Sequence, residues 1–448
     1  SIATFSAKNH DDFPYYHFQY IHLLTSSNLS IGIGQFNHGF RTPSSIFYLS
    51  SLFYLPKVNF QLVHLAPIYF LGFANFIFLK KIFKFLDQRK NLYLVIFSIL
   101  SLALINIFFY RLAEHGTDRS AQILILLLIF ELIILINLKN KIITNNLSKI
   151  LILCTITISL KVFYFIYLSL MLIIINNQKI FFNVVSEIIK NKVSYLCILL
   201  IAMLFLTNLL NTGCFIYPMS VTCILDSQWS IPLVEVKNMN QWYQQWSKAG
   251  ATPNFAIENP EIYIQNFNWV SNWVDVYFFN KVSDYLFGLI FLIVLFFIFF
   301  EKKTQRKYLK RNFWSIYLIL LFLLFEWFYF HPALRYGGYH LIALLIFIPF
   351  SVFMEKQILM NKKNIKRIKI FISLIFIIFF VRNIDRIYNE HKIYNYNPVK
   401  YPSYNIEFNN LNISSRIINI KSCYKGLECQ KDNIQLKKKY IFDIFTKK

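Results

Sequence analysis

Two adjacent carboxylates near the start of the chain are the residues best suited to acid–base chemistry. Asp11 and Asp12 follow His10 and lie just before Pro14, a residue that can open a helix. A helix N-terminus favours the ionised form of a nearby acid. As a general base, such a carboxylate can take a proton from an acceptor hydroxyl, with His10 as a further substrate contact. The alternative is a helix cap beside a solvated acid.

Two short polar segments carry further candidates for contact with a substrate. His38 and Arg41 follow a glycine-rich turn and can face a phosphate near a membrane surface, or can pack or contact lipid headgroups. Asp118 and Arg119 lie in a compact polar turn between two apolar runs, where they can contact a sugar or simply pair with each other. Asp12 and Asp118 are also the candidate ligands of a divalent metal ion, which would be the cofactor.

Two cations later in the chain are placed to bind a phosphate. Arg335 precedes Tyr336 in a short turn between apolar runs, and a guanidinium at a membrane edge can bind a phosphate through two parallel hydrogen bonds. We expect Tyr336 to contact the same substrate. Lys161 interrupts a long apolar stretch and can supply a second cation. Both cationic side chains can instead extend to lipid headgroups.

Tryptophans gather in one predicted outer loop, residues 211–282, which holds five of the seven in the chain. Trp242, Trp246 and Glu258 belong to a polar stretch of this loop. Aromatic rings stack on the faces of sugars, and binding pockets combine such rings with a few polar groups. These three residues are therefore candidates for a sugar-binding pocket.

Amphipathic patterns predict helices that lie in the membrane interface. One begins at Pro14, and a second begins with Thr42 as its N-cap and Pro43 as its first residue and ends at Pro56. In a third, Tyr263–Tyr277, apolar residues recur every three or four positions opposite polar ones, which predicts a helix lying flat on the membrane. These helices would position the acidic pair and the aromatic residues at the outer surface.

Apolar runs long enough to cross a bilayer recur along the chain, in which 56% of residues are apolar. The stretch Ile150–Asn176 is better explained as two short helices that meet near Lys161, and the final run Ile368–Val381 is short for a full crossing. A first span is expected to precede Ser1, which begins an outer segment. These patterns predict an all-α polytopic membrane protein with about ten crossing or half-crossing helices. The other expected spans are 61–79, 91–110, 120–137, 193–210, 283–300, 313–330 and 339–355.

The distribution of basic residues gives the expected orientation. The chain carries 46 Lys and Arg against 22 Asp and Glu, a balance that by itself suggests an acidic partner such as nucleic acid. Half of these basic residues fall in short loops at one end of the predicted spans, as cytoplasmic loops require. The charge is therefore a signal of membrane topology, and we expect membrane lipid and no nucleic acid as a partner.

Cysteine pairs and loop lengths complete the predicted organisation. Cys214 and Cys223 lie close together in an outer segment, as do Cys423 and Cys429, so we expect two disulfides there, with free thiols as the alternative. The expected parts are an outer loop with the acidic pair (1–60), transmembrane helices (61–210), the outer Trp-rich loop (211–282), further transmembrane helices (283–381) and an outer tail (382–448).

Together these features resemble the GT-C superfamily of membrane glycosyltransferases, whose first outer loop carries an acidic pair followed by two interfacial helices. Asp11 and Asp12 match the acidic position, the helix after Pro43 matches the second interfacial helix, and Arg335 matches a later basic residue near the donor phosphate. A further resemblance, to uncharacterised bacterial membrane proteins of polysaccharide-synthesis loci, rests on the stretches His10–Tyr16, His38–Ser45, Cys214–Cys223 and Trp242–Pro260.

The GT-C resemblance implies transfer of a sugar from a polyprenyl-phosphate donor to an acceptor glycan or lipid, in the synthesis of cell-surface polysaccharide. Asp11 or Asp12 would deprotonate the acceptor hydroxyl, while cations near Arg335 and Lys161 would stabilise the departing lipid phosphate. The resemblance implies a bacterial inner membrane protein whose site faces the periplasm. The alternatives are a polymerase or ligase of lipid-linked saccharides, a transporter of them, and a structural membrane subunit.

Overall fold

The computed structural model describes residues 2, 5, 12–57, 60, 62–88, 91–112, 116–137, 144–177, 181–224, 227–252, 257–300, 313–358, 360–394 and 434–447. These residues are mostly helical, which confirms the predicted predominance of helices. Five helices in the described ranges are long and apolar enough to cross a membrane. They are α3 (Leu65–Gln88), α6 (Thr117–Asn137), α10 (Lys192–Thr212), α14 (Ser283–Phe299), which continues a helical run from Val270, and α16 (Gly338–Gln357).

Shorter apolar helices complete the bundle. They are α4 (Leu92–Ala103), which runs into a π-helical turn at Leu104–Phe108, α7 (Thr144–Leu160), a 3₁₀ segment Val162–Leu170 followed by α8 (Met171–Asn177), and α15 (Trp314–Phe330). As expected, the helical conformation is interrupted at Lys161, which is extended between two helical segments. The short run Ile368–Val381 lies inside the 33-residue helix α17 (Lys362–Tyr394). The amphipathic helix α9 (Phe181–Lys190) joins α8 to α10.

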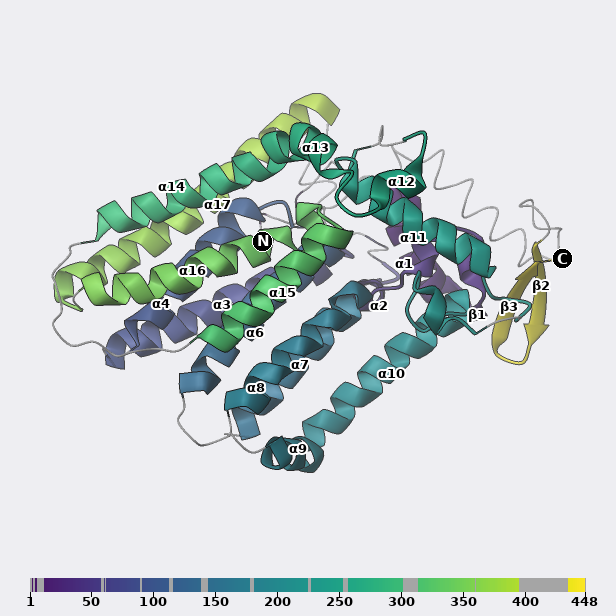
Figure 1. The fold of residues 1–448 in the computed structure, drawn as a ribbon, viewed down its shortest axis with the longest axis horizontal. Coiled ribbons are helices and arrows are strands. Elements are labelled where there is room, and N and C mark those ends of the chain that lie inside the picture. Colours follow the sequence, from purple (N-terminus) through teal and green to yellow (C-terminus); the bar gives the residue numbers. More distant parts are fainter. Residues whose placement is uncertain are drawn as a thin grey trace.

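The long helices lie side by side with α6 at their centre (Figure 1). In its most apolar 18 residues α6 is 83% buried, whereas the same measure is 22% for α10 and 28% for the run that ends in α14. α6 packs against α3, α4, α7, α8 and α16. The residues of α10 and α14 that the protein leaves exposed are mostly apolar, among them Leu199 and Phe291, as on a surface that faces lipid.

The connecting elements of the predicted outer segments gather at one end of these helices, where Figure 1 shows α1, α11 and α12 together. These elements are a π-helical turn (Phe13–His17), α1 (Phe18–Ser26), 3₁₀ turns at Ile33–Gln35, His38–Arg41 and Ser220–Thr222, α2 (Ser45–Ser51), α11 (Leu233–Lys248), α12 (Pro260–Ile264), α13 (Val270–Trp273) and a π-helical segment (Val274–Val282). The basic residues in the second half of α3 and at the start of α17 lie toward the ends of these helices that are away from the gathered outer segments. This arrangement agrees with the orientation that the charges predict.

Of the first two predicted interfacial helices, one has different bounds in the structure and the other is present. The second begins at Ser45, because the hydroxyl of Ser44 rather than that of Thr42 caps it by accepting from the backbone N–H of Ile46. It ends at Ser51, five residues before Pro56. The first is present as the turn from Phe13 and α1, with Pro14 in its first turn.

The prediction of one flat helix over Tyr263–Tyr277 is wrong. α12 ends before Asn266, whose φ of 47° is a left-handed conformation that a right-handed helix cannot contain. The chain resumes with α13, and its helical path then continues without a break into α14. The apolar positions of this segment recur at helical spacing because its second half forms the first turns of a long apolar helix, not because it lies flat.

A small sheet joins the two ends of the chain, which the sequence pattern did not indicate. It consists of β1 (Leu29–Ile31), β2 (Ile434–Lys439) and β3 (Phe442–Lys447) in the order β1-β3-β2. β3 is parallel to β1 and antiparallel to β2. The ring of Phe445 packs edge-on against that of Phe36 at 4.7 Å. This end of the predicted outer tail therefore returns to the first outer segment (Figure 1).

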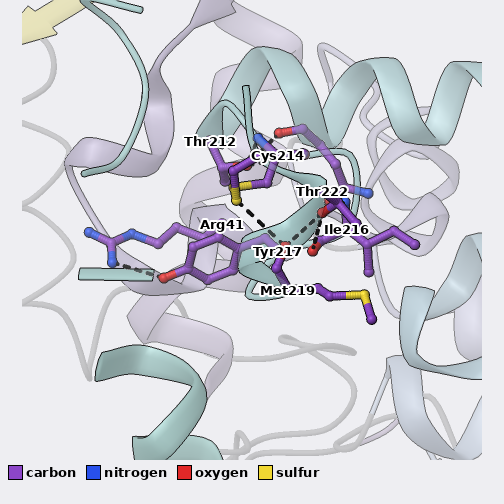
Figure 2. The surroundings of a disulfide bond; sticks show 9 residues. Arg41, Thr212, Cys214, Ile216, Tyr217, Met219 and Thr222 are labelled. Atoms are coloured by element: carbon purple, nitrogen blue, oxygen red, sulfur yellow. Dashed lines mark hydrogen bonds between the residues drawn. A yellow bond between two sulfur atoms is a disulfide. The ribbon is translucent and has the colours of Figure 1, made fainter. Parts of the chain in front are cut away.

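The outer loop after α10 is held by the expected bridge between Cys214 and Cys223. Figure 2 shows the side chain of Arg41 directed at the Tyr217 hydroxyl within this loop, to which Arg41 donates at 3.1 Å. Another nitrogen of Arg41 pairs with Glu235 of α11 at 2.5 Å. The bridge, Arg41 and α11 therefore form one continuous set of contacts. The other expected pair, Cys423 and Cys429, lies outside the described residues.

Removal of this bridge is expected to lower stability by about 3 kcal/mol, because the unfolded chain gains the freedom of an open loop. The test is the thermal unfolding of a Cys214→Ser/Cys223→Ser variant in detergent. With Cys423 and Cys429 also replaced by serine in both proteins, reductant should lower the unfolding temperature of the chain that has Cys214 and Cys223 to that of the variant, and leave the variant unchanged. An unfolding temperature of the wild type that reductant does not alter would contradict this prediction.

An ion pair inside the helical bundle stabilises the end of α6 away from the gathered outer segments. Glu131 of α6 is 4% exposed and pairs with Lys81 of α3 at 3.0 Å. An acid inside an apolar helix is costly unless it is paired. The sequence did not indicate Lys81 as the partner of Glu131, because Lys81 belongs to a basic cluster that the pattern places in a loop.

Candidate functional site

Four charged residues from different parts of the sequence form one cluster at the outer end of the bundle. The guanidinium of Arg335 donates through Nε to Oδ2 of Asp118 at 3.0 Å and through Nη2 to Oδ2 of Asp12 at 3.2 Å. The ammonium of Lys161 donates to the other oxygen of Asp118. We call Asp12, Asp118, Lys161 and Arg335 the charge cluster. Its two carboxylates balance its two cations.

The turn that carries Arg335 is fixed by side chains from four helical segments. Trp273 donates to the carbonyl of Pro332 at 3.0 Å, Trp327 to that of Ala333 at 2.9 Å, and Gln122 to that of Arg335 at 2.7 Å. The hydroxyl of Tyr277 accepts from the backbone N–H of Leu334 at 2.9 Å. Because its backbone groups are engaged in this way, the turn can hold a guanidinium in one position.

The break in the chain after α7 positions Lys161. Ser44, which caps α2, also donates its hydroxyl to the carbonyl of Leu160 at 2.5 Å. This bond ties the first outer segment to the end of α7. Asp118 lies in the first turn of α6, where the helix dipole favours a negative charge. The start of α6 therefore positions Asp118, and the end of α7 positions Lys161.

Asp12 stands at the start of the first outer helix, and a glycine sets the position of this helix. The ring of Tyr16, one turn later, lies so close to Gly39 that a Cβ there would be 2.2 Å from Tyr16 Cγ. Any residue larger than glycine would push the turn that carries Asp12 away from the cluster. Burial and the nearby charge of Asp12 raise the pKa of Tyr16 well above its ordinary value.

Aromatic rings surround the cations of the cluster. The Tyr336 ring centroid lies 4.3 Å from Nζ of Lys161 and 5.6 Å from Cζ of Arg335, and the Trp246 centroid lies 5.5 Å from that Cζ. Trp246 and Tyr336 meet at 5.7 Å. Cations over ring faces are stabilised by the ring quadrupole. The same rings offer apolar faces of the kind that sugars stack on.

Burial and neighbouring charges set the protonation of the groups at this outer end. Burial lowers the pKa of Arg335, but Asp118, Tyr336 and Asp12 raise it, and the result lies well above the ordinary value. Burial raises the pKa of Tyr336 to about 12. Burial, together with Lys248 and Lys161, lowers the pKa of His331 to about 3. At neutral pH the site therefore combines a fixed guanidinium with a neutral imidazole and a neutral phenol.

Several predicted site residues lie apart from the charge cluster. Arg41 is 6% exposed and bonds to protein groups, including the carbonyl of Gly34 at 2.8 Å, which is the packing role that the sequence left open. His38 and Trp242 face each other with ring centroids 6.1 Å apart. Glu258 is exposed.

Two residues of the predicted acidic segment, His10 and Asp11, lie outside the described residues, as do Glu114 and His115 of the polar turn. The alternative pairing of Asp118 with Arg119 is not observed, because Asp118 pairs with Lys161 and Arg335. The guanidinium of Arg119 instead lies against the rings of Phe109 and Tyr339.

The residues present do not fit a divalent metal site at Asp12 and Asp118. Three of the oxygens that a metal would need already accept hydrogen bonds from Lys161 or Arg335. Within the described ranges no group of three or more His, Cys, Asp or Glu residues is arranged to hold a metal ion. Arg335, which contacts both carboxylates, and Lys161, which contacts Asp118, supply the positive charge that a metal would bring.

Sequence reasoning missed residues that support the cluster rather than form it. Gln122 holds the carbonyl of Arg335 and lies one helical turn after Asp118, on the same face of α6. A polar residue four positions after a candidate acid, inside an otherwise apolar helix, is a signal that could have identified it. Nothing local in the sequence distinguishes Gly39 or Ser44, because their roles depend on contacts across the fold.

Comparison with known proteins gives a family but no activity. Residues 2–342 match the profile of a family described as a domain of unknown function (DUF8201). No curated protein and no solved structure matches the chain. All four residues of the charge cluster fall within the matched range.

Proposed function

The chain belongs to the DUF8201 family, and we propose that it transfers a sugar from a polyprenyl-phosphate donor to an acceptor hydroxyl at the outer face of a membrane. The observation that carries this proposal is the charge cluster, in which an acid of the first outer segment contacts the cation of the last outer turn. Residues more than 300 positions apart in the sequence, with Asp118 and Lys161 between them, meet beside two aromatic rings.

The proposed chemistry divides the cluster by role. Asp12 takes the proton of the acceptor hydroxyl while the oxygen of that hydroxyl bonds to the sugar C1. The bond from C1 to the phosphate oxygen breaks with its electron pair, and the lipid phosphate leaves as an anion. Arg335 and Lys161 stabilise this developing charge, while Asp118 holds both cations in place. The faces of Trp246 and Tyr336 orient the sugar ring.

The membrane arrangement that supports this chemistry is the one expected from the sequence. Five of the described helices are long and apolar enough to cross a membrane, and in this proposal the shorter apolar helices add the remaining crossings and half-crossings. The charge cluster then lies at the outer surface, opposite the basic ends of the helices. In a bacterial inner membrane this surface faces the periplasm, where donors and acceptors of cell-surface polysaccharide synthesis meet.

Asp12→Asn is expected to lower the rate of transfer at least about 100-fold, because the variant lacks a general base. The assay follows release of undecaprenyl phosphate, in liposomes with the reconstituted full chain, from donors carrying glucose, galactose or mannose. Asp284→Asn, which removes an exposed acid at the start of α14, is the matched control and should keep the wild-type rate.

The companion variant Asp11→Asn tests which acid of the pair acts. A loss in Asp12→Asn alone assigns the base to Asp12, and a loss in Asp11→Asn alone assigns it to Asp11. If both variants transfer sugar as fast as the wild type, the proposed acid–base chemistry fails.

A further inference from the structure

The contact between Asp12 and Arg335 conflicts with the roles that the proposed function gives to these two residues. Oδ2 of Asp12 accepts from Nη2 of Arg335 at 3.2 Å. A carboxylate that accepts from a guanidinium is held in its ionised form and is a weaker base than a carboxylate without such a partner. The guanidinium in turn attracts a phosphate less strongly while a carboxylate neutralises part of its charge. Each residue therefore restrains the other as long as they are in contact.

The two carboxylates on Arg335 differ in how firmly they are held. The side chain of Asp118 is 6% exposed, and its oxygens accept from Lys161 and from Nε of Arg335. The side chain of Asp12 is 28% exposed. An ion pair open to water contributes little to stability, whereas removal of one partner from a buried pair leaves a charge without solvation. The contact of Arg335 with Asp12 is therefore the one that opens more easily.

The elements that carry these three charges allow the contact to open without a change of fold. Asp118 lies in the first turn of α6, and hydrogen bonds to backbone carbonyls fix the turn that carries Arg335. Asp12 instead stands at the N-cap of the turn Phe13–His17, where its side chain makes no capping hydrogen bond. Rotation of the Asp12 side chain is therefore enough to release Arg335 and leaves the turn intact.

A phosphate bound to Arg335 competes with Asp12 for one nitrogen. A guanidinium holds a phosphate through two parallel N–H groups on one edge, and both edges that offer such a pair include Nη2. Nη2 is the nitrogen that donates to Asp12, whereas Nε donates to Asp118. Two anions on the same nitrogen repel each other. Asp12 and a phosphate are therefore alternative partners of Nη2, and the contact of Nε with Asp118 can persist with either of them.

We propose that the contact between Asp12 and Arg335 is a resting state that the donor itself opens. The phosphate of the donor replaces Asp12 on Nη2, and the released carboxylate then takes the proton of the acceptor hydroxyl. The inference rests on the proposed function, which makes Arg335 a phosphate contact and Asp12 the base. It adds an order to that function, because an acceptor that arrives before the donor meets a carboxylate still held by Arg335.

The test is a binding measurement that needs no sugar transfer. The purified full chain is titrated with farnesyl phosphate, and with farnesol as the same tail without a phosphate. Asp12→Asn keeps the shape of the side chain but removes the competing charge, so it should bind farnesyl phosphate about two- to fivefold more tightly than the wild type does. Its affinity for farnesol should equal that of the wild type. A variant expected to lose catalysis is thus expected to gain affinity for the donor phosphate.

A control variant and a second measurement separate competition at Arg335 from a general effect of charge. Asp284→Asn removes an exposed acid at the start of α14 and should bind farnesyl phosphate as the wild type does. The second measurement is an experimental structure of the wild type with farnesyl phosphate. In that complex Nη2 of Arg335 should contact the phosphate, and Asp12 should lie beyond hydrogen-bond distance of Arg335. This structure decides the question even if Asp12→Asn does not fold.

Affinity for farnesyl phosphate in Asp12→Asn that is no higher than in the wild type would overturn the proposal, as would an equal gain in Asp284→Asn. Equal affinity of the wild type for farnesyl phosphate and farnesol, or a complex in which Asp12 still contacts Arg335, would also overturn it. Tighter binding in Asp12→Asn alone supports the exchange of partners even if the wild type transfers no sugar. A wild type that transfers sugar while Asp12→Asn gains no affinity refutes this inference and leaves the proposed function standing.

Discussion

Replacement of Asp118 by Asn is expected to destabilise the folded chain by about 3–5 kcal/mol, because it leaves two cations without the charge that they share. The side chain of Asp118 is 6% exposed, and its two oxygens accept hydrogen bonds from Lys161 and Arg335. Asparagine keeps one acceptor oxygen but carries no charge. Water cannot replace the lost charge at so buried a position. The measurement is thermal and denaturant unfolding of the full chain in nanodiscs.

Two variants make this stability prediction specific. Asp12→Asn removes the other acid of the cluster, but the side chain of Asp12 is 28% exposed, so the expected loss is only about 1 kcal/mol. Asp118→Asn/Lys161→Met removes one cation together with the anion and should recover part of the stability. If Asp118→Asn unfolds no earlier than Asp12→Asn, then Asp118 does not hold the cluster together.

Replacement of Arg335 by Lys is expected to lower the rate of sugar transfer at least about 100-fold although the positive charge remains. The guanidinium bonds to Asp118 through Nε and to Asp12 through Nη2 at the same time. An ammonium carries its three donors on one nitrogen at the end of a flexible stem, so it cannot keep carboxylate and phosphate partners in one plane. Transfer from the undecaprenyl-phosphate donors, measured alongside the unfolding temperature, separates lost catalysis from lost folding.

Arg382→Lys, the same exchange at a guanidinium bonded to a backbone carbonyl, is the control for Arg335→Lys and should keep the wild-type rate. A rate for Arg335→Lys above half that of the wild type would contradict the assigned role. Comparison of Arg335→Ala with Asp12→Asn also separates the main alternative. Polymerases and ligases of lipid-linked saccharides depend on arginine more than on an acidic pair, so loss in Arg335→Ala alone would favour such an enzyme.

The parts of the fold that the sequence predicted depend on local composition. The long apolar helices follow from runs of apolar residues, and the break at Lys161 follows from a charge that interrupts one of them. The bridge between Cys214 and Cys223 follows from two cysteines nine positions apart in an outer segment. Such features are decided by neighbours in the chain, and the surrounding fold needs only to accept them.

The parts that the sequence did not predict depend on contacts between distant residues. Helical spacing in Tyr263–Tyr277 is the same for a helix lying on a membrane as for the first turns of a spanning one, so the pattern could not tell the two apart. Strand β1 has three residues, and it is held by β3 from the other end of the chain. The partner of Glu131 lies on another helix, 50 positions away.

The candidate site shows the same division. The positions of Asp12, Asp118, Lys161 and Arg335 relative to the apolar runs predicted that these acids and cations share one membrane face. Only the tertiary structure decided which of them meet. The packing of α6 against its neighbours directs Asp118 toward Lys161 and Arg335 and directs Arg119, one position later, against the rings of Phe109 and Tyr339. Side chains one residue apart on a helix point in different directions, and the elements packed on each side, which no local pattern specifies, determine whether a charge is paired.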